Sequence, residues 1–407
     1  MRRVVITGYG VVSALGLSVP EAFQRLKRLE NVIRRSDDLA GYKGLQTQLC
    51  STADAFVYPE RYTRKVIRTM GRVSVMALNA TEQALEQAGL MGDPVLKGGR
   101  TGVAYGSSSG SVDALADFYT IIHTREVKSV TSSTYIKMMP QTTSVNLSVH
   151  FGTTGRLIPT GTACTSGSLA IGQAYEAIKF GLQDVMIAGG AEEFSPTQVA
   201  VFDTLFATSR LNDTPNLTPR AFDKNRDGLV IGEGAGTLIL EAYDHAVARG
   251  ARILAEVVGF GTNTDGRHVT QPNHETMGRA LGMALADAGI PPETIGYVNA
   301  HGTATDQGDI AEGQATFGIF GDRVPVSTIK NYTGHTLGAC GALESILSIE
   351  MMRNGWFAPN LNLTEPDERC GALDLIMGDG RSFQTDHVMS NNFAFGGVNT
   401  SLIFAKV

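Results

Sequence analysis

The chain has 407 residues and a formal net charge of −6, with 43% hydrophobic and 18% charged residues. This length exceeds one simple core and favours two domains or a duplicated unit. The acidic balance disfavours nucleic-acid binding, and no apolar run reaches the roughly 18 residues of a membrane helix, so we expect neither a nucleic acid nor a membrane as partner.

The first residues raise the question of a signal peptide, because Met1-Arg2-Arg3 precede a short apolar stretch. Residues 4–10 are too short for a signal sequence, are interrupted by Thr and Gly, and precede no small-residue cleavage site. We expect a β-strand there instead. The four cysteines form no Cys-x-x-Cys pair, which disfavours disulfides and zinc and favours a reducing, cytoplasmic setting. They are Cys50, Cys164, Cys340 and Cys370.

Short β-branched runs alternate with helical patterns along the chain. Strands are predicted at residues 4–7, 102–105, 184–188, 234–240, 324–326 and 401–404, and helices at 72–88, 168–180 and 341–353. The strand at 184–188 is expected to stop at Gly189-Gly190. This alternation predicts βαβ units around buried, mainly parallel sheets, which is an α/β fold.

Two segments repeat one pattern, a strand followed by a small-residue turn and a helix, at residues 158–180 and 324–354. The first turn carries Cys164 and the second carries His335. The repeat predicts two similar halves with a join near Arg249-Gly250, so we expect one half at residues 1–250 and the other at 251–407.

Cys164 follows a run of small residues at 160–163 and stands just before a predicted helix. Unpaired N–H groups at a helix N-terminus stabilise a thiolate, so we expect a lowered thiol pKa and a reactive nucleophile. The competing interpretation is a small, inert, buried cysteine. The flanking glycines favour access for a substrate.

His301 and His335 each lie where a predicted strand runs into a glycine-containing turn, the place where α/β folds bind ligands. The other six histidines lack that setting. A metal site is the rival interpretation, but neither histidine has a ligand-spaced partner, so we expect no metal. Residues 391–399 add a Gly-Gly loop with two aromatics, which is either a plain hairpin turn or an aromatic gate.

Together these motifs resemble the β-ketoacyl-acyl-carrier-protein synthases, most closely the elongating type II enzymes of bacterial fatty-acid and polyketide synthesis. The motifs follow the family's order and spacing over the whole chain: Thr-Ala-Cys-Thr-Ser-Gly at 162–167, Asn-Ala-His-Gly-Thr-x-Thr at 299–305, Lys-x-x-x-x-His at 330–335 and Phe-Gly-Gly-x-Asn at 395–399. The resemblance implies the thiolase fold, a duplicated α/β unit in five αβαβα layers, and a dimer.

The resemblance also implies a reaction. Cys164 takes an acyl group as a thioester, and the backbone N–H groups of Cys164 and Phe395 form the oxyanion hole. His301 and His335 stabilise the enolate that remains when a malonyl unit loses CO2. Both substrates are carried on the phosphopantetheine of an acyl carrier protein, so no separate cofactor is implied.

Supporting roles follow from the same resemblance. Lys330 and Glu344 are expected to pair and orient His335, and Asp309 and Glu312 match acidic positions after the first histidine motif. The expected gate comprises Phe393, Ala394, Phe395, Gly396 and Gly397. The expected pantetheine contacts are Thr303, Thr305 and Thr270. The expected docking face for the carrier comprises Arg64, Lys65, Arg68 and Arg72.

Several features depart from the family pattern, among them Ile329 before Lys330 and Asn331-Tyr332 after it in place of small or Met residues. Ala394 stands where the family has Gly, Ser107-Ser108-Ser109 replace a stretch that carries an apolar residue, and segment 131–144 at the implied dimer contact is rich in Thr, Ser and Met. An added methyl at Ala394 stiffens the loop or excludes a positive φ. We hypothesise an acyl pocket suited to a specialised polyene or polyketide route, while housekeeping fatty-acid elongation stays open.

Three other functions compete with a condensing enzyme. A degradative thiolase uses a second cysteine in a Cys-x-Gly setting, which neither Cys340 nor Cys370 offers. A chain-length factor, the non-catalytic partner of a heterodimeric synthase, typically lacks the nucleophile, whereas Cys164 is present with both histidines. A cysteine hydrolase has least support. A homodimer and a heterodimer both remain open.

Overall fold

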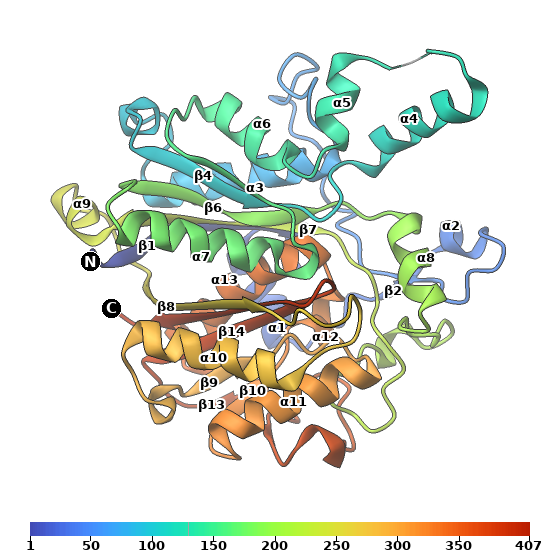
Figure 1. Cartoon of the computed structure of the whole chain (residues 1–407), viewed down its shortest axis with the longest axis vertical. Helices are drawn as coiled ribbons and strands as arrows, with labels where there is room; N and C mark the ends of the chain where they lie inside the picture. The colour runs from blue at the N-terminus through green and yellow to red at the C-terminus, as the bar shows by residue number, and fades with distance from the viewer. Residues whose placement is uncertain (129) are drawn as a thin grey trace.

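The computed structural model describes residues 1–128 and 130–407, and one mixed sheet runs through the described chain (Figure 1). The sheet has 11 strands in the order β12-β10-β9-β14-β15-β8-β1-β7-β6-β4-β5. Strands of the N-terminal half are β1 Val4–Ser13, β4 Thr101–Gly106, β5 Leu157–Thr160, β6 Val185–Glu192 and β7 Gly234–Ala242. Those of the C-terminal half are β8 Ala255–Thr264, β9 Tyr297–Asn299, β10 Pro325–Ser327, β12 Asp374–Leu375, β14 His387–Ala394 and β15 Val398–Ala405.

The two halves of the sheet repeat one topology. The order β5-β4-β6-β7-β1 has its counterpart in β10-β9-β14-β15-β8, and each half combines parallel pairs at its far edge with antiparallel pairs toward the middle. The halves meet where β1 pairs with β8, at Val4 opposite Val257. This repetition confirms the predicted duplicated α/β unit.

Helices separate and cover the two halves in layers (Figure 1). On one outside lie α3 Arg72–Ala88 and α6 Thr142–Phe151, and on the other lie α10 His274–Ala288 and α11 Asp306–Phe320. Between the two halves of the sheet lie α7 Ser166–Lys179 and α13 Cys340–Asn354, which are buried along most of their length. The order is therefore αβαβα, the five-layer thiolase architecture that the resemblance implies.

Equivalent turns introduce the two central helices. A one-turn 3-10 helix precedes α7 at Ala163–Thr165, and another precedes α13 at Leu337–Ala339. Each begins with a non-glycine residue of positive φ, 50° at Ala163 and 48° at Leu337. The sequence repeat at 158–180 and 324–354 is thus a structural repeat.

Two predicted strands were too short at their glycine ends. β1 continues through Gly8 and Gly10 to Ser13, and β6 continues through Gly189 and Gly190 to Glu192. In the structure these glycines mark close packing rather than turns. A side-chain carbon at Gly8 would overlap the Ala84 carbonyl oxygen of α3, and one at Gly190 would overlap the Gly338 carbonyl oxygen.

The remaining described elements are short or peripheral. They are α1 Val19–Lys27, α2 Asp37–Ala40, α4 Val112–Thr124, α5 Ser132–Met138, α8 Pro196–Thr204, α9 Tyr243–Ala248, α12 Lys330–Thr333, β2 Arg34–Arg35, β3 Leu49–Cys50, β11 Trp356–Phe357 and β13 Arg381–Ser382. Among the described helices, none combines the length and apolar character needed to cross a bilayer.

The close approach of α3 to β1 gives a stability prediction. Gly8→Ala should lower the free energy of unfolding by about 1–3 kcal/mol, because the added methyl overlaps the helix backbone. Gly282→Ala in α10 meets no atom within 4 Å and should raise stability by about 0.5–1 kcal/mol. Urea denaturation of both variants measures the difference. Equal stability of the two variants would contradict the packing described.

Candidate active site

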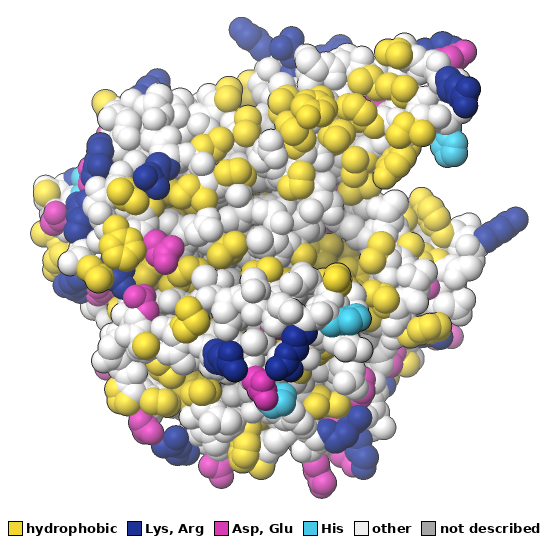
Figure 2. Space-filling view, in the orientation of Figure 1, with side chains coloured by type: hydrophobic (Ala, Val, Ile, Leu, Met, Phe, Trp, Pro, Cys, Tyr) yellow, Lys and Arg dark blue, Asp and Glu magenta, His cyan; other side chains and the backbone are white. Residues whose placement is uncertain are grey.

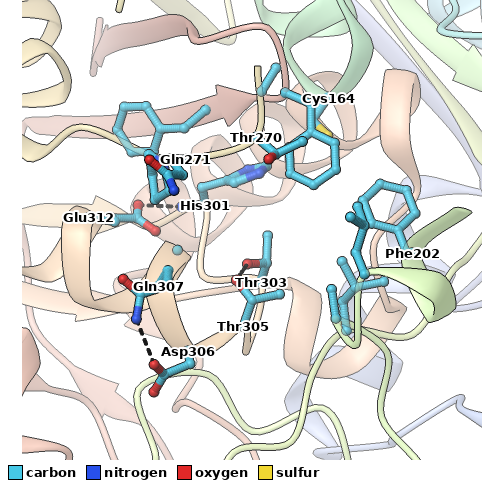
Figure 3. A pocket seen from close by; sticks show the side chains of 18 of the residues that line it. Cys164, Phe202, Thr270, Gln271, His301, Thr303, Thr305, Asp306, Gln307 and Glu312 are labelled. Atoms are coloured by element: carbon cyan, nitrogen blue, oxygen red, sulfur yellow. Dashed lines mark hydrogen bonds between the residues drawn. The ribbon is translucent and has the colours of Figure 1, made fainter. Parts of the chain in front are cut away.

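Cys164 lies at the start of the central layer, in the turn between β5 and α7. Its side chain is buried, with 5% exposure, at the inner end of a cavity (Figure 3). Burial raises the pKa of the thiol to about 12, although the ammonium of Lys330 and the backbone N–H groups of Cys164 and Phe395 act in the opposite direction. The expected lowering of this pKa is therefore wrong, because loss of water around the sulfur outweighs the helix N-terminus.

His335 approaches the sulfur directly. Its Nε2 lies 3.0 Å from Sγ of Cys164, and its Nδ1 accepts a hydrogen bond from the backbone N–H of Leu337 at 3.3 Å. Burial, followed by the charge of Lys330, holds the pKa of His335 well below its usual value, so the ring is neutral. Because Nδ1 is an acceptor, the single ring proton sits on Nε2 and points at the sulfur.

His301 follows β9 and lies edge-on to His335, with ring centroids 5.1 Å apart at 87°. Nδ1 of His301 lies 3.0 Å from Nζ of Lys330 and 3.3 Å from Nδ2 of Asn392. Both neighbours donate, so Nδ1 accepts and Nε2 carries the proton. Burial and the charge of Lys330 lower the pKa of His301 well below its usual value.

A buried ion pair supports His301 rather than His335, which corrects the expected arrangement. Nζ of Lys330 lies 2.5 Å from Oε1 of Glu344, and Nδ2 of Asn392 donates to Oε2 of Glu344 at 2.7 Å. Lys330 and Glu344 do pair as expected, but their hydrogen bonds reach the first histidine. Only the charge of Lys330 acts on the second. Asn392 completes this network and was not singled out from the sequence, although it lies in the stretch 391–399 that carries the two glycines.

Two carboxylates fix the turn that carries His301. Glu312 of α11 accepts the backbone N–H groups of His301 and Gly302, each at 2.6 Å, and burial raises its pKa to about 8. Asp309 accepts from Ala304 and Phe222, and burial raises its pKa to about 6. These acidic positions therefore bind the backbone of the turn that carries His301.

The expected gate is the turn of the hairpin between β14 and β15. Gly396 and Gly397 supply its positive φ values, 90° and 71°. Ala394 pairs with Val398 in the regular ladder, so its methyl group meets no backbone conflict. Phe395 stacks on Phe202 of α8 with ring centroids 5.2 Å apart. Phe393 is buried, and its ring lies 6.2 Å from that of His301.

One cavity of about 400 Å³ joins these groups to the surface (Figure 3). It is lined by Cys164, His301 and His335 at its inner end, and by all three expected threonines, Thr303, Thr305 and Thr270. The hydroxyls of Thr303 and Thr305 lie 2.9 Å apart. A cavity with hydroxyls along its wall suits a chain that contains amide groups.

A second hollow of about 170 Å³ also borders Cys164. Its walls combine apolar residues, among them Val201, Phe202 and Leu337, with polar Ser108, Ser109 and Gln198. Buried Glu192 holds the serine run, accepting the backbone N–H and the hydroxyl of Ser108 at 2.8 and 2.5 Å. Ser108 and Ser109 therefore line this hollow next to the buried carboxylate of Glu192.

Cys340 is a residue that sequence reasoning did not place in the site. Its Sγ donates to the carbonyl oxygen of Cys164 at 3.2 Å and lies 3.6 Å from Nδ2 of Asn392. Burial raises the pKa of its thiol well above the usual value, so it stays protonated. Cys340 thus packs behind the backbone of Cys164. Cys50 belongs to the apolar cluster that also contains Cys164, and Cys370 belongs to another cluster.

The expected docking residues divide into two groups. Arg64, Lys65 and Arg68 lie in exposed turns and form no ion pair with any described residue. Arg72 is partly buried, because its Nη2 binds the buried Glu233 at 2.7 Å and the Ala53 carbonyl oxygen at 3.0 Å, and its part in docking stays a prediction. That ion pair anchors the start of α3.

The Cys164, His301 and His335 side chains bring three ligand-type atoms within 4.8 Å of one another. A metal ion would need lone pairs at this point. The contacts to Leu337, Lys330 and Asn392 instead place protons on Nε2 of both histidines, so the arrangement offers donors. The site suits a negatively charged oxygen better than a cation.

Comparison with known proteins gives a consistent result. Residues 1–246 match the family described as β-ketoacyl synthase, N-terminal domain, and residues 254–364 match its C-terminal domain. The chain is 36% identical to 3-oxoacyl-[acyl-carrier-protein] synthase 1 of Haemophilus influenzae, covering 100% of this chain and 99% of that one. It is 37% identical to synthase 2 of Vibrio cholerae with the same coverage.

Solved structures of ketosynthases are similar to this chain over its whole length. A β-ketoacyl synthase from Burkholderia phymatum is 56% identical, with a TM-score of 0.98 and complete coverage of both chains. The ishigamide ketosynthase/chain length factor is 29% identical, with a TM-score of 0.91, covering 100% of this chain and 99% of that one.

The raised thiol pKa predicts how Cys164 reacts in the absence of substrate. The thiolate fraction should still be rising at alkaline pH, so the rate of alkylation by iodoacetamide should increase about tenfold per pH unit between about pH 7 and pH 9. Mass spectrometry of the Cys164 peptide measures the rate, with Cys164→Ser as blank. A plateau below about pH 8 would show a lowered pKa instead.

Proposed function

The chain belongs to the β-ketoacyl synthase family, and from this membership and the geometry of its site we propose a decarboxylative condensation. An acyl group held on Cys164 joins a malonyl unit carried by an acyl carrier protein, releasing CO2 and leaving a β-ketoacyl product on the carrier. The observation that carries this proposal is the pair of neutral imidazoles whose Nε2 protons converge beside Sγ of Cys164.

In the first half-reaction Cys164 acts as nucleophile. Its sulfur attacks the thioester carbonyl of the acyl carrier, and the pantetheine thiol leaves with a proton. The backbone N–H groups of Cys164 and Phe395 both act on the sulfur position, so we assign them as the oxyanion hole for the tetrahedral intermediate. The positive charge of buried Lys330 stabilises the thiolate during this step.

In the second half-reaction His301 and His335 bind the malonyl thioester oxygen. As CO2 leaves, negative charge grows on this oxygen, and two N–H donors on neutral rings stabilise it without giving up a proton. The resulting carbanion attacks the acyl carbonyl carbon, the bond from that carbon to the Cys164 sulfur breaks, and the released thiolate takes up one proton from water to restore the free thiol. We assign Lys330, Glu344 and Asn392 as positioning residues that keep Nδ1 of His301 an acceptor.

The two hollows that border Cys164 match two parts of the substrate, the pantetheine arm and the acyl chain. We propose that Thr303, Thr305 and Thr270 bind the pantetheine arm in the larger cavity and that the acyl chain enters the second hollow. The substrate then arrives with its own phosphopantetheine, and the reaction requires no other cofactor. The polar wall at Ser108, Ser109 and Gln198 supports a specialised acyl chain, such as a polyene or polyketide, over a saturated one.

We propose that Arg64, Lys65 and Arg68 attract the carrier. They are exposed cations on a chain of net charge −6, and acyl carriers are acidic. One relative of known structure is described as a ketosynthase bound to its acyl-carrier protein. We also propose a cytoplasmic location, which the free state of all four cysteines supports.

A second copy of the chain is the proposed partner for the face around α4 and α5. Only Ala114 of α4 is buried, and Tyr119, Ile122 and Tyr135 are more than half exposed. Figure 2 shows hydrophobic side chains gathered over this part of the surface. We propose a homodimer through this face, with a related non-catalytic subunit as the alternative partner. The two thiolase-like halves are proposed to divide at residues 1–250 and 251–407.

Two relatives of known structure are described as a ketosynthase with a chain length factor, which makes a non-catalytic role the second candidate function. The presence of Cys164, His301 and His335 in one cavity favours the catalytic role, because a subunit without chemistry has no need of this arrangement.

The proposed reaction is tested by intact mass spectrometry of the protein mixed with an acyl carrier and a malonyl carrier. The wild type should form an acyl adduct and a β-ketoacyl carrier, Cys164→Ala should form neither, and His301→Ala or His335→Ala should each reduce product formation about 100-fold or more. Cys50→Ala, which removes another buried free thiol, is the matched control.

An adduct that survives in Cys164→Ala would contradict the nucleophile. Absence of any adduct on the wild type across several chain types would favour the non-catalytic subunit.

A further inference from the structure

The second hollow beside Cys164 contains a polar group that the proposed reaction does not use. Gln198 of α8 lines this hollow together with Ser108 and Ser109, and only 7% of Gln198 is exposed. The other walls are mostly apolar and include Val201, Phe202, Leu337 and Phe395. A buried amide in such a wall requires hydrogen-bond partners, so its contacts indicate what the hollow can bind.

The carboxylate of Glu192 sets the direction of the hydrogen bonds along this wall. Glu192 is fully buried and accepts the backbone N–H groups of Ser108 at 2.8 Å and Ser109 at 3.2 Å. It also accepts the N–H of Gly338 at 3.0 Å and the hydroxyl groups of Ser107 at 3.1 Å and Ser108 at 2.5 Å. Five donors around two oxygens suit the ionised form, which only accepts, so the single hydroxyl proton of Ser108 is directed at Glu192.

The next contacts of the wall follow from this direction. Oγ of Ser108 lies 3.4 Å from Oγ of Ser109, and because the Ser108 proton is already used, Ser109 is the donor. Oγ of Ser109 then accepts from Nε2 of Gln198 at 3.3 Å. Oε1 of Gln198 accepts the N–H of Ser195, which caps the start of α8. The second hydrogen on Nε2 is therefore left without an acceptor among the residues that the structure describes.

We propose that this second hydrogen of Gln198 recognises an acyl chain that carries a keto or hydroxyl oxygen while the chain is held on Cys164. The inference rests on the proposed condensation and narrows its substrate class from specialised acyl chains in general to oxygenated ones. A hydrocarbon chain, whether saturated or a polyene, would displace water from the amide without replacing its hydrogen bond, which lowers the rate about tenfold. The apolar walls accommodate the carbons next to the oxygen.

The test compares three acyl groups of equal length, each on free pantetheine so that carrier docking plays no part: hexanoyl, 3-hydroxyhexanoyl and 5-oxohexanoyl. Intact mass spectrometry measures the rate at which each group is transferred to Cys164. At least one oxygenated group should be transferred about tenfold faster than hexanoyl. In Gln198→Leu that oxygenated group should react about tenfold more slowly than in the wild type, and hexanoyl should react faster, whereas loss of the fold would slow both.

Two further variants separate recognition from a folding defect. Gln198→Glu keeps an oxygen for the N–H of Ser195 and in its ionised form has no donor, so the ratio of the oxygenated rate to the hexanoyl rate should fall toward one. Thr197→Ala removes an exposed hydroxyl of α8 that lines neither hollow, and its rates should equal those of the wild type.

Equal rates for all three acyl groups on the wild type would overturn the proposal and leave the condensation intact. An unchanged preference in Gln198→Leu or in Gln198→Glu would also overturn it, because the oxygen would then be recognised elsewhere. Absence of any adduct on the wild type, from these three groups and from carrier-bound acyl groups, would overturn the condensation and this proposal together.

Discussion

The buried ammonium of Lys330 is the contact on which the rest of the site depends. It is 1% exposed and lies between the Glu344 carboxylate and Nδ1 of His301. A charge this deep requires a close partner and complete hydrogen bonding, which Glu344 and Asn392 supply. Burial lowers the pKa of His301 and His335, and the ammonium of Lys330 acts in the same direction, so both rings are neutral. At Cys164 burial raises the pKa of the thiol, and the same ammonium opposes that rise.

The duplicated fold explains how these groups meet. Cys164 begins the central helix of one half, and His335 precedes the central helix of the other, so packing of α7 against α13 brings them to 3.0 Å. Glycine makes this packing possible, because a side-chain carbon at Gly167 would lie 2.9 Å from the Gly338 carbonyl oxygen. The chemistry thus sits where the two repeats touch, and neither half holds the site alone.

Much of this was predictable from the sequence, for identifiable reasons. The helix at 72–88 has its predicted bounds because its apolar periodicity ends at a glycine, Gly89, that adopts a φ of 69°. Cys164, His301 and His335 were found because each lies at a strand-to-turn junction in a family motif. The loop within residues 391–399 was identified through its two glycines, Gly396 and Gly397.

What the sequence could not provide depends on distant contacts. Lys330 is five residues from His335, yet its side chain reaches back to His301, which only the turn of α12 reveals. The sequence suggests that Arg72 is a surface cation, because its partner Glu233 lies far along the chain. The sequence shows only the helix that follows Cys164, which would lower the pKa of the thiol. The structure shows that the thiol is buried, and burial raises this pKa.

The proposed reaction requires that His301 and His335 are both neutral and carry their proton on Nε2, which is tested most directly by 15N NMR of the histidine-labelled protein near neutral pH. We expect Nε2–H tautomers for both residues, assigned by loss of each signal in the matching His→Ala variant. An imidazolium or an Nδ1–H tautomer at either position would contradict it, because that ring could not then serve as a neutral Nε2–H donor as proposed.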